Sequence, residues 1–350
     1  GRGIVGISYL IAGTSIFLWR MLLNWILRRR MIFDERLLIV GADEMARNLV
    51  VEVLAHRRDG YRVLGMVDDN PDLQGVSVVN PKVLGTTSQI CDLALEHKAT
   101  RVVVAQKESR GRLDLDALLR CKTQGIPVER GSEFLERLTG KIAVNRPRVV
   151  SQLVFSRGFV VSPLVLLAKR ALDISVASAI LFAALPVMVL AAIAIRLDSP
   201  GSIFFSQERV GRHGKVFRLW KFRSMSQDAE APGEAVWAAE NDPRVTRVGK
   251  IFRKTRVDEL PQLWNVLVGD MSLVGPRPER PEFVSELLDV SPLYKERLVV
   301  RPGITGWAQI QAPYASSVAA SIDKLRYDLY YIKNLSVFLD LSILASTVRT

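Results

Sequence analysis

The sequence predicts an α/β protein that combines membrane helices with two folded domains. Two long apolar stretches, Ile4–Leu27 and Ile174–Ile195, are separated by more polar segments. Between them, short apolar runs alternate with segments of helical periodicity, which is typical of a parallel sheet. The length of 350 residues, with 49% hydrophobic and 24% charged residues, is sufficient for two buried cores set between apolar segments.

The first apolar stretch is predicted to cross a membrane. Ile4–Leu27 is mostly apolar, broken by Arg20, and basic residues follow at 28–30. A spanning helix needs about 20 apolar residues, and positive residues tend to stay in the cytosol. Residues 1–30 are therefore predicted to form a transmembrane helix with a cytosolic carboxyl end, a buried helix of a soluble bundle being the alternative. Because the chain begins with Gly1 rather than Met, we expect a longer native chain and no signal peptide.

Residues 31–150 are predicted to form a Rossmann-like domain. The segments Leu37–Val40, Tyr61–Val67 and Arg101–Ala105 are apolar runs of strand length. A helical stretch follows the first run, and a second one around Cys91–His97 precedes the third. Strands that alternate with helices pair in parallel, so these segments indicate a parallel sheet.

The turn after the first strand is similar to a dinucleotide-binding loop but lacks its second glycine. That glycine lets the backbone approach a pyrophosphate. The turn begins at Gly41 and has Asp43, which would repel the anion. A structural or regulatory role is therefore favoured over an NAD site, although Asp68 after the second strand could face a ribose.

The net charge of +12 fits three kinds of partner, namely nucleic acid, an anionic lipid surface or a phosphorylated substrate. Between residues 244 and 256 the basic residues recur at a spacing near three without an acid, which suits one face of a helix. An ordinary solvated face is the alternative. These basic residues are Arg244, Arg247, Lys250, Arg253, Lys254 and Arg256.

The cysteines and histidines do not indicate a metal site or a disulfide framework. Cys91 and Cys121 are the two cysteines, and they form no CxxC pair. The three histidines are scattered along the chain. We therefore predict reduced thiols and no histidine-based metal centre.

The second apolar stretch is predicted to enter the membrane and return to the same side. Ile174–Ile195 contains Pro186 near its middle and has basic residues beyond both ends. Basic residues at both ends argue against a straight crossing, and a central proline bends a helix. Residues 151–200 are therefore predicted to form a linker and a re-entrant helix bent at Pro186, with an ordinary kinked span as the alternative.

Residues 201–350 are predicted to form a mixed α/β domain that carries the chemistry. In Lys221–Met225 basic and apolar residues alternate, as in a strand with one charged face. The basic stripe described above follows it. Next come an acidic pair with a helical pattern, within Val257–Asn265, and two rigid arginine turns, Gly275–Pro278 and Arg301–Gly303.

The acidic pair Asp258 and Glu259 is the strongest candidate for a catalytic site. Leucines and a tryptophan recur after it at helical spacing, and Pro261 is tolerated only in a first turn. A helix is therefore predicted to begin at or just before Asp258. Its dipole would keep Asp258 ionised and nucleophilic, and a carboxylate can attack phosphorus to form an acyl phosphate. A simple helix cap is the alternative.

The two arginine turns are candidates for phosphate binding. Arg277 lies between two prolines, and Arg301 precedes Pro302 and Gly303. Guanidinium forks suit phosphate oxygens, and phosphoryl transfer depends mostly on positioning and charge neutralisation. A divalent cation, Mg²⁺, is expected where a carboxylate meets a diphosphate. Exposed arginines in ordinary turns are the alternative.

From about Lys169 to its end, the chain resembles the polyprenyl-phosphate sugar-phosphate transferases of the monotopic phosphoglycosyl transferase superfamily. Several long motifs in the same order carry the resemblance. They are Gln207–Gly211, Lys221–Met225, Asp258–Leu267, Gly269–Pro278 and Arg301–Trp307.

The resemblance implies a mechanism with named residues. Asp258 of the Asp258–Glu259 pair would attack the β-phosphate of a UDP-sugar, release UMP and hold the phosphosugar covalently. Polyprenyl phosphate, which is undecaprenyl phosphate in bacteria, would then take it. Asp258 would also bind Mg²⁺. The basic motifs that face the substrate in this family fall on Lys221, Arg223, Arg253 and Arg277.

The resemblance also implies an architecture and a location. The sheet domain is similar to that of long-form members, in which it follows a bundle of membrane helices, so residues 1–30 would be the last of these. The family bends its re-entrant helix at a Ser-Pro pair, whereas this chain has Leu185 before Pro186. We expect a homodimer of the exopolysaccharide-initiating branch in the inner membrane, with its catalytic domain facing the cytoplasm and no nucleic-acid partner.

Two other functions compete with this one. A membrane-bound NAD-dependent nucleotide-sugar oxidoreductase would use Gly41 and Asp68, but it needs a complete glycine loop and a Tyr-x-x-x-Lys base. Tyr327 is followed four residues later by Tyr331, and Tyr294 is followed directly by Lys295. A non-enzymatic scaffold for polysaccharide assembly would leave the acidic pair and the rigid arginine turns without a purpose.

Overall fold

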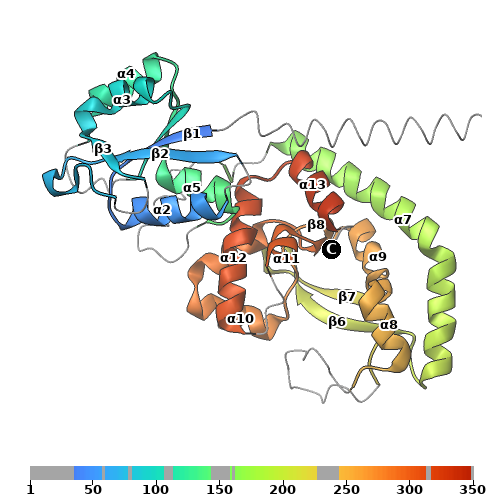
Figure 1. The fold of residues 1–350 in the computed structure, drawn as a ribbon. Helices are drawn as coiled ribbons and strands as arrows, with labels where there is room; N and C mark the ends of the chain where they lie inside the picture. Colours follow the sequence, from blue (N-terminus) through green and yellow to red (C-terminus); the bar gives the residue numbers. More distant parts are fainter. Residues whose placement is uncertain are drawn as a thin grey trace, which may run out of the picture. The chain divides into compact units, whose positions relative to one another are not determined.

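The computed structural model describes residues 35–56, 60–77, 81–105, 113–142, 158–159, 162–226, 244–312 and 317–347. Its chain divides into two compact units, Gly1–Gly140 and Lys141–Thr350 (Figure 1). The transmembrane helix predicted over residues 1–30 lies outside the described residues.

The first unit is built on a parallel sheet, as the alternating pattern predicts. In its described part five strands follow the order β3-β2-β1-β4-β5, and every adjacent pair is parallel. The strands are β1 (Glu35–Val40), β2 (Tyr61–Val67), β3 (Val83–Gly85), β4 (Arg101–Val104) and β5 (Val128–Arg130). The helices are α2 (Glu44–Ala55), α3 (Ile90–Glu96), α4 (Leu115–Thr123) and α5 (Gly131–Thr139), with 3₁₀ turns η3 (Pro71–Leu73) and η4 (Thr87–Gln89). This strand order matches the first five strands of the Rossmann order 3-2-1-4-5-6.

Each face of this sheet has its own core because successive strand residues point to opposite sides. Leu37 and Ile39 of β1 pack with α2 and α5, whereas Leu38 and Val40 pack with α3 and α4. Figure 1 shows the two helix pairs on opposite faces. The thiols of Cys91 and Cys121 are free and are buried in the second core.

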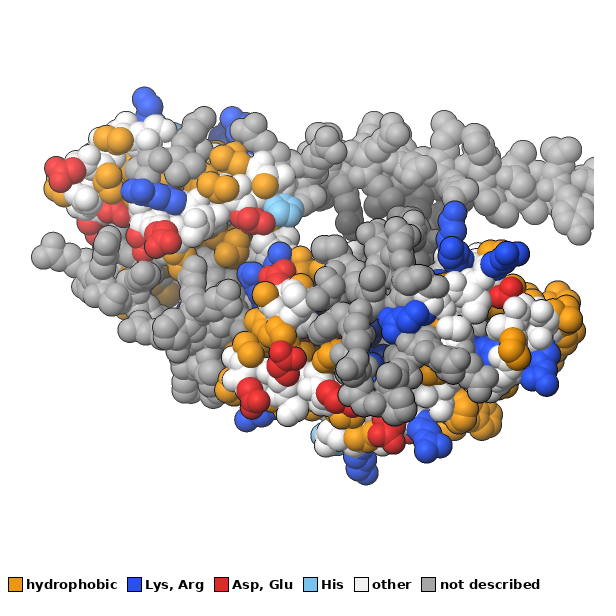
Figure 2. All heavy atoms as spheres, turned by 90° about the horizontal axis from the view of Figure 1, so that it is seen from below, with side chains coloured by type: hydrophobic (Ala, Val, Ile, Leu, Met, Phe, Trp, Pro, Cys, Tyr) orange, Lys and Arg blue, Asp and Glu red, His pale blue; other side chains and the backbone are white. Residues whose placement is uncertain are grey.

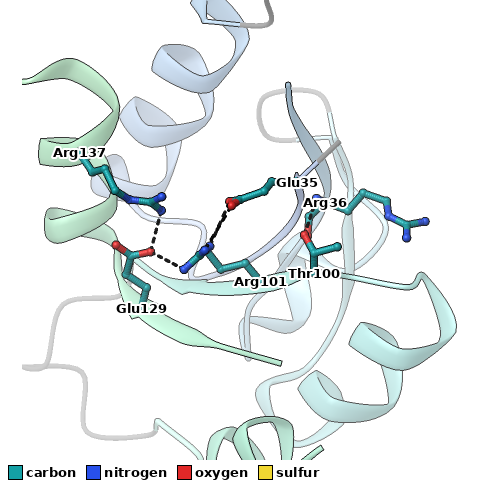
Figure 3. A network of polar contacts seen from close by, with 6 residues as sticks. All are labelled: Glu35, Arg36, Thr100, Arg101, Glu129 and Arg137. Carbon is teal, nitrogen blue, oxygen red and sulfur yellow. Dashed lines mark hydrogen bonds and ion pairs between the residues drawn. The ribbon is translucent and has the colours of Figure 1, made fainter. Parts of the chain in front are cut away.

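Charged side chains connect three neighbouring strands of this sheet (Figure 3). The guanidinium group of Arg101 in β4 donates to Glu35 of β1 at 3.1 Å and to Glu129 of β5 at 3.0 Å. Arg137 of α5 donates to the same carboxylate oxygen of Glu129 at 3.0 Å. The network therefore stabilises the pairing of β1, β4 and β5.

The first described helix of the second unit is the long helix α7 (Pro163–Asp198). Among the described residues it is the one helix long and apolar enough to cross a membrane, and only 11% of its most apolar window is buried. It extends past the predicted Ile174–Ile195 at both ends, and Pro186 lies inside it. Figure 1 shows that α7 changes direction along its length.

Both ends of α7 pack against the same unit. Near the first end, Lys169 donates to the carbonyl oxygen of Val274 at 2.9 Å and to Asp340 at 2.7 Å. At the other end, Asp198 accepts the backbone N–H of Val248 at 3.2 Å. The middle of the helix exposes large apolar side chains, such as Phe182 at 83% exposure. In Figure 2 hydrophobic and basic side chains lie next to each other at the edge of this unit that carries α7.

The rest of the second unit mixes short strands and helices, as predicted. Strands β6 (Phe204–Val210) and β7 (Val216–Phe222) form an antiparallel ribbon, and β8 (Ser272–Val274) pairs in parallel with β9 (Gly303–Thr305). The α-helices are α8 (Arg247–Thr255), α9 (Gln262–Val268), α10 (Pro281–Val290), α11 (Trp307–Gln311), α12 (Val318–Lys333) and α13 (Val337–Thr347). The 3₁₀ segments are η6 (Arg212–Gly214), η7 (Val257–Glu259) and η8 (Pro292–Val299).

Candidate active site

The acidic pair lies where two helices meet the end of a strand. Helix α8 packs through Val248 and Phe252 against α7 and against Phe222 of β7. Gly249 permits this approach, because a Cβ atom there would collide with the backbone of Ser224. Arg256 ends α8 in the left-handed conformation, at φ 59°, and turns the chain directly into η7, which carries Asp258 and Glu259.

The predicted position of the pair at a helix start is confirmed in outline. Helical backbone begins at Val257 as the 3₁₀ turn η7, and the α-helix α9 follows from Gln262. The capping residues are Arg256 for η7 and Pro261 for α9, so neither carboxylate caps a helix. The simple capping role is therefore wrong.

Glu259 is surrounded by three basic groups from three different segments. Its Oε1 atom lies 3.6 Å from Lys221 Nζ of β7, 3.7 Å from Arg256 Nη1 and 3.8 Å from Arg277 Nη2. Its side chain is only 12% exposed. Burial alone would raise the pKa of Glu259, but these three cations outweigh that effect and lower it. Glu259 is therefore held as a carboxylate.

Asp258 has a different environment. The residue is 7% exposed, and among the described residues no hydrogen-bond donor reaches its Oδ1 atom. Burial and the neighbouring charge of Glu259 raise the pKa of Asp258, and Lys221 and Arg253 oppose them. The pKa of Asp258 is thus shifted upward, opposite to the direction expected from a helix dipole alone.

Lys221 faces both carboxylates and two arginines. Burial and the charge of Arg277 lower the pKa of Lys221 to about 8, although Glu259 acts in the opposite direction. A lysine of this kind loses its charge in mildly alkaline solution.

The other predicted phosphate-binding residues divide into two groups. Arg253 donates through Nε to Ser224 Oγ at 3.1 Å, and its charge acts on Asp258, so it belongs to the acidic pair's surroundings. Arg301 donates to the carbonyl oxygen of Gly269 at 2.9 Å, and the described contacts do not bring it to the pair. Its contact with phosphate stays a prediction.

Arg223 makes its described contacts at the end of α7. Both terminal nitrogens donate to the chain just after α7, to Pro200 O at 2.8 Å and to Ser199 O at 2.7 Å. A buried guanidinium with these contacts holds the end of α7. Contact of Arg223 with phosphate stays a prediction. The alternation of basic and apolar residues in the sequence could not reveal this non-local partner.

Asn265 is a structural member of the site that the sequence pattern did not reveal. It is 2% exposed, and its side chain accepts from the N–H of Trp220 at 3.1 Å and donates to Arg218 O at 2.8 Å. These bonds fix α9 to β7, the strand that carries Lys221. A buried amide inside an apolar helical pattern was the available signal.

Among the described residues, a divalent cation at Asp258 would need further ligands from a substrate. The described residues contain no group of three or more potential acidic, histidine or cysteine ligands. Asp258 Oδ1 is a buried oxygen to which no described donor is bonded. Since Mg²⁺ is commonly bound through one or two carboxylates, substrate phosphates and water, Asp258 fits the predicted metal ligand.

In the first unit, two carboxylates accept hydrogen bonds from the backbone of the turn that begins at Gly41. Asp43 Oδ1 accepts the N–H groups of Met45 and Ala46, both at 3.1 Å. Asp68 Oδ2 accepts the N–H of Ala42 at 2.8 Å. These acids occupy the backbone donors that a pyrophosphate would need, which disfavours the NAD-dependent alternative.

Comparisons with known proteins agree with the division into two units. A family model described as a bacterial sugar transferase matches residues 164–350, and one described as a CoA-binding domain matches residues 2–119. The chain is 44% identical to the UDP-N-acetylgalactosamine-undecaprenyl-phosphate N-acetylgalactosaminephosphotransferase of Aeromonas hydrophila, over 67% of this chain and 54% of that protein.

Two further relatives each match about half of this chain. The UDP-glucose:undecaprenyl-phosphate glucose-1-phosphate transferase of Escherichia coli is 43% identical over 52% of this chain and 39% of its own length. The exopolysaccharide production protein PSS of Rhizobium leguminosarum is 39% identical over 52% of this chain and 94% of its own length. The chain thus spans about half the length of the Aeromonas relative and most of the Rhizobium one.

The environment of Lys221 makes a prediction about its titration. Replacing Arg277 by Gln removes a repelling charge and should raise the pKa of Lys221 above about 8, whereas Glu259→Gln removes an attracting charge and should lower it. Labelling with an amine reagent across a pH series, followed by mass spectrometry, measures both shifts. Arg218→Gln, at an exposed position of the same strand, is the control. Equal titration of Lys221 in all these variants would contradict the described cluster.

Proposed function

Because this chain belongs to the bacterial sugar transferase family, we propose that it transfers a sugar-1-phosphate from a UDP-sugar to undecaprenyl phosphate and releases UMP. The names of the relatives from Aeromonas and Escherichia describe the transfer of such groups to undecaprenyl phosphate. The observation that carries the proposal is a buried aspartate with one unbonded oxygen beside a glutamate that three cations neutralise. We place this reaction at the first membrane step of exopolysaccharide synthesis.

In the first step, a carboxylate oxygen of Asp258 attacks the β-phosphorus of the UDP-sugar. A new bond forms between this oxygen and phosphorus, and the bond from phosphorus to the bridging oxygen breaks. The electron pair leaves with UMP. The sugar-1-phosphate is then attached to Asp258 as an acyl phosphate.

In the second step, a phosphate oxygen of undecaprenyl phosphate attacks the same phosphorus. The acyl phosphate bond breaks, which restores the carboxylate of Asp258, and the product is an undecaprenyl diphosphate sugar. Splitting the transfer into two displacements lets one site serve a nucleotide and a lipid in turn.

The basic residues around the pair supply charge neutralisation, which dominates catalysis of phosphoryl transfer. Lys221, Arg253 and Arg277 surround the acidic pair and would face the diphosphate. Glu259 holds Lys221 and Arg277 at one oxygen atom. We therefore propose that Glu259 positions these cations while Asp258 reacts.

We propose that Asp258 also holds Mg²⁺ together with the diphosphate of the donor. When bound, the ion would neutralise charge on the diphosphate and on the departing UMP. The unbonded Oδ1 atom of Asp258 supports this role.

We propose further that α7 enters the membrane, bends at Pro186 and returns to the cytoplasmic side. Its two ends make polar contacts with one folded unit, through Lys169 at the first end and Asp198 at the other. An apolar middle between two ends that bind the same unit favours a re-entrant path over a straight crossing. This path would keep the site at the inner face of the bacterial inner membrane, where both substrates meet. The expected homodimer stays a prediction.

Removing the nucleophile should abolish the first step. In Asp258→Asn we expect UMP release to fall by at least about 10³-fold, and in Glu259→Gln by about 10²-fold, because positioned charge is lost. UMP release is measured with undecaprenyl phosphate and a panel of UDP-glucose, UDP-galactose and UDP-N-acetylgalactosamine. Asp323→Asn, a half-exposed acid on α12, is the matched control. Normal turnover by Asp258→Asn would exclude the covalent mechanism.

The metal ligand can be tested without turnover. With UDP-glucose present, we expect the protein to bind Mn²⁺, a probe for Mg²⁺, and Asp258→Asn to weaken that binding because it removes the only proposed protein ligand. Electron paramagnetic resonance of bound Mn²⁺ measures the effect, with Asp323→Asn as control. Unchanged Mn²⁺ binding in Asp258→Asn would remove this role from the residue.

The path of α7 predicts the side on which its ends lie. Cysteines introduced by Ser162→Cys and Ser202→Cys flank the helix, while the native cysteines are buried. In intact cells both should resist a membrane-impermeant maleimide, and both should react after the inner membrane is opened. Labelling of either position in intact cells would contradict the re-entrant arrangement.

A further inference from the structure

A buried arginine that the proposed chemistry does not use lies directly behind Arg277. Arg297, in η8, is 7% exposed. Its Nε atom donates to Asp328 Oδ2 at 2.8 Å, Nη1 donates to the hydroxyl group of Tyr294, and Nη2 donates to the backbone carbonyl of Arg277 at 2.7 Å. All three guanidinium nitrogens therefore have partners, and one of these partners belongs to the active-site loop.

The loop that carries Arg277 is held at four consecutive carbonyl groups. The carbonyls of Pro276 and Glu279 accept backbone N–H groups, from Gly303 and Val210, each at 2.9 Å. The carbonyl of Pro278 accepts from Arg209 at 3.1 Å. The remaining one, that of Arg277, accepts from Arg297, so this bond fixes the peptide plane between Arg277 and its following proline.

Asp328 in turn fixes Arg297. It lies in α12, is 2% exposed, and pairs with Arg297 alone among the described ion pairs. The pair joins α12 to the loop through one guanidinium group. A continuous set of contacts thus runs from Asp328 through Arg297 and Arg277 to Glu259, beside the proposed nucleophile.

We propose that Arg297, anchored by Asp328, is a positioning residue that directs the guanidinium group of Arg277 toward Glu259 and the donor diphosphate. This inference rests on the proposed function, since it deepens the role of Arg277. Misplacement of a positioned group by about 1 Å can reduce a rate by about 10²-fold.

Lys221 provides a reporter for the position of Arg277. The charged groups that face Lys221 are Arg277, Glu259, Arg209 and Asp258. Among these neighbours Arg277 has the largest effect and lowers the pKa of Lys221. If Arg277 swings away, this pKa should rise, and the alkaline limb of the pH–rate profile should move to higher pH.

The test compares Arg297→Lys with the double substitution Arg297→Met/Asp328→Leu in the full chain. Lysine cannot donate to all three partners of the Arg297 guanidinium group in the same geometry. The apolar pair replaces a buried ion pair without leaving one charge uncompensated. In both variants we expect kcat/KM for UMP release to fall about 10- to 100-fold and the alkaline limb to rise. Adding Arg277→Gln to either variant should cause no loss beyond that of Arg277→Gln alone.

Arg101→Lys is the matched control, because Arg101 also joins two carboxylates but belongs to the sheet unit. Its kinetics and pH profile should remain those of the unchanged protein. An unmoved alkaline limb, or losses that simply add to those of Arg277→Gln, would overturn the positioning role. If the positioning role fails but Asp258→Asn is inactive, the proposed function stands. If Asp258→Asn is active, the proposed function itself is overturned.

Discussion

The neutralisation of one buried carboxylate organises the second unit. A single oxygen of Glu259 lies within 3.8 Å of basic atoms from β7, from the turn after α8 and from the loop between β8 and α10. Such a charge is costly to bury unless it is paired, so these segments must come together for the fold to be stable. The same arrangement leaves Asp258 beside it with an oxygen that no described donor occupies.

The buried polar groups of the long helix α7 are also paired. Its polar residues near the ends find buried partners, as Lys169 does with Asp340 and as Asp173 does with Ser272 and Leu273. Its middle, which exposes apolar side chains, has almost no protein cover. The polar ends of α7 bind one unit, and its apolar middle is exposed. Both features support the proposed re-entrant path.

The sheet unit shows which structural elements local sequence can predict. The runs around Leu37–Val40, Tyr61–Val67 and Arg101–Ala105 were confirmed as strands because several apolar residues in a row leave little choice. Strands β3 and β5 were not predicted, since each has only three residues and exists through pairing with a distant neighbour. Asp43 stands where a dinucleotide-binding loop has its second glycine, and its side chain caps α2. The structural role of this turn stays a prediction.

The sequence by itself determined the family, the parallel sheet, the apolar helix and the acidic pair, because each depends on residues close together in the chain. Only the tertiary structure decided which buried polar side chains bind to which partners. It showed that Arg223 binds the chain at the end of α7 and that Asn265 connects α9 to β7. It also placed Arg297 behind Arg277. These contacts join residues 20 or more positions apart, and spacing along a chain carries no information about which buried donor meets which acceptor.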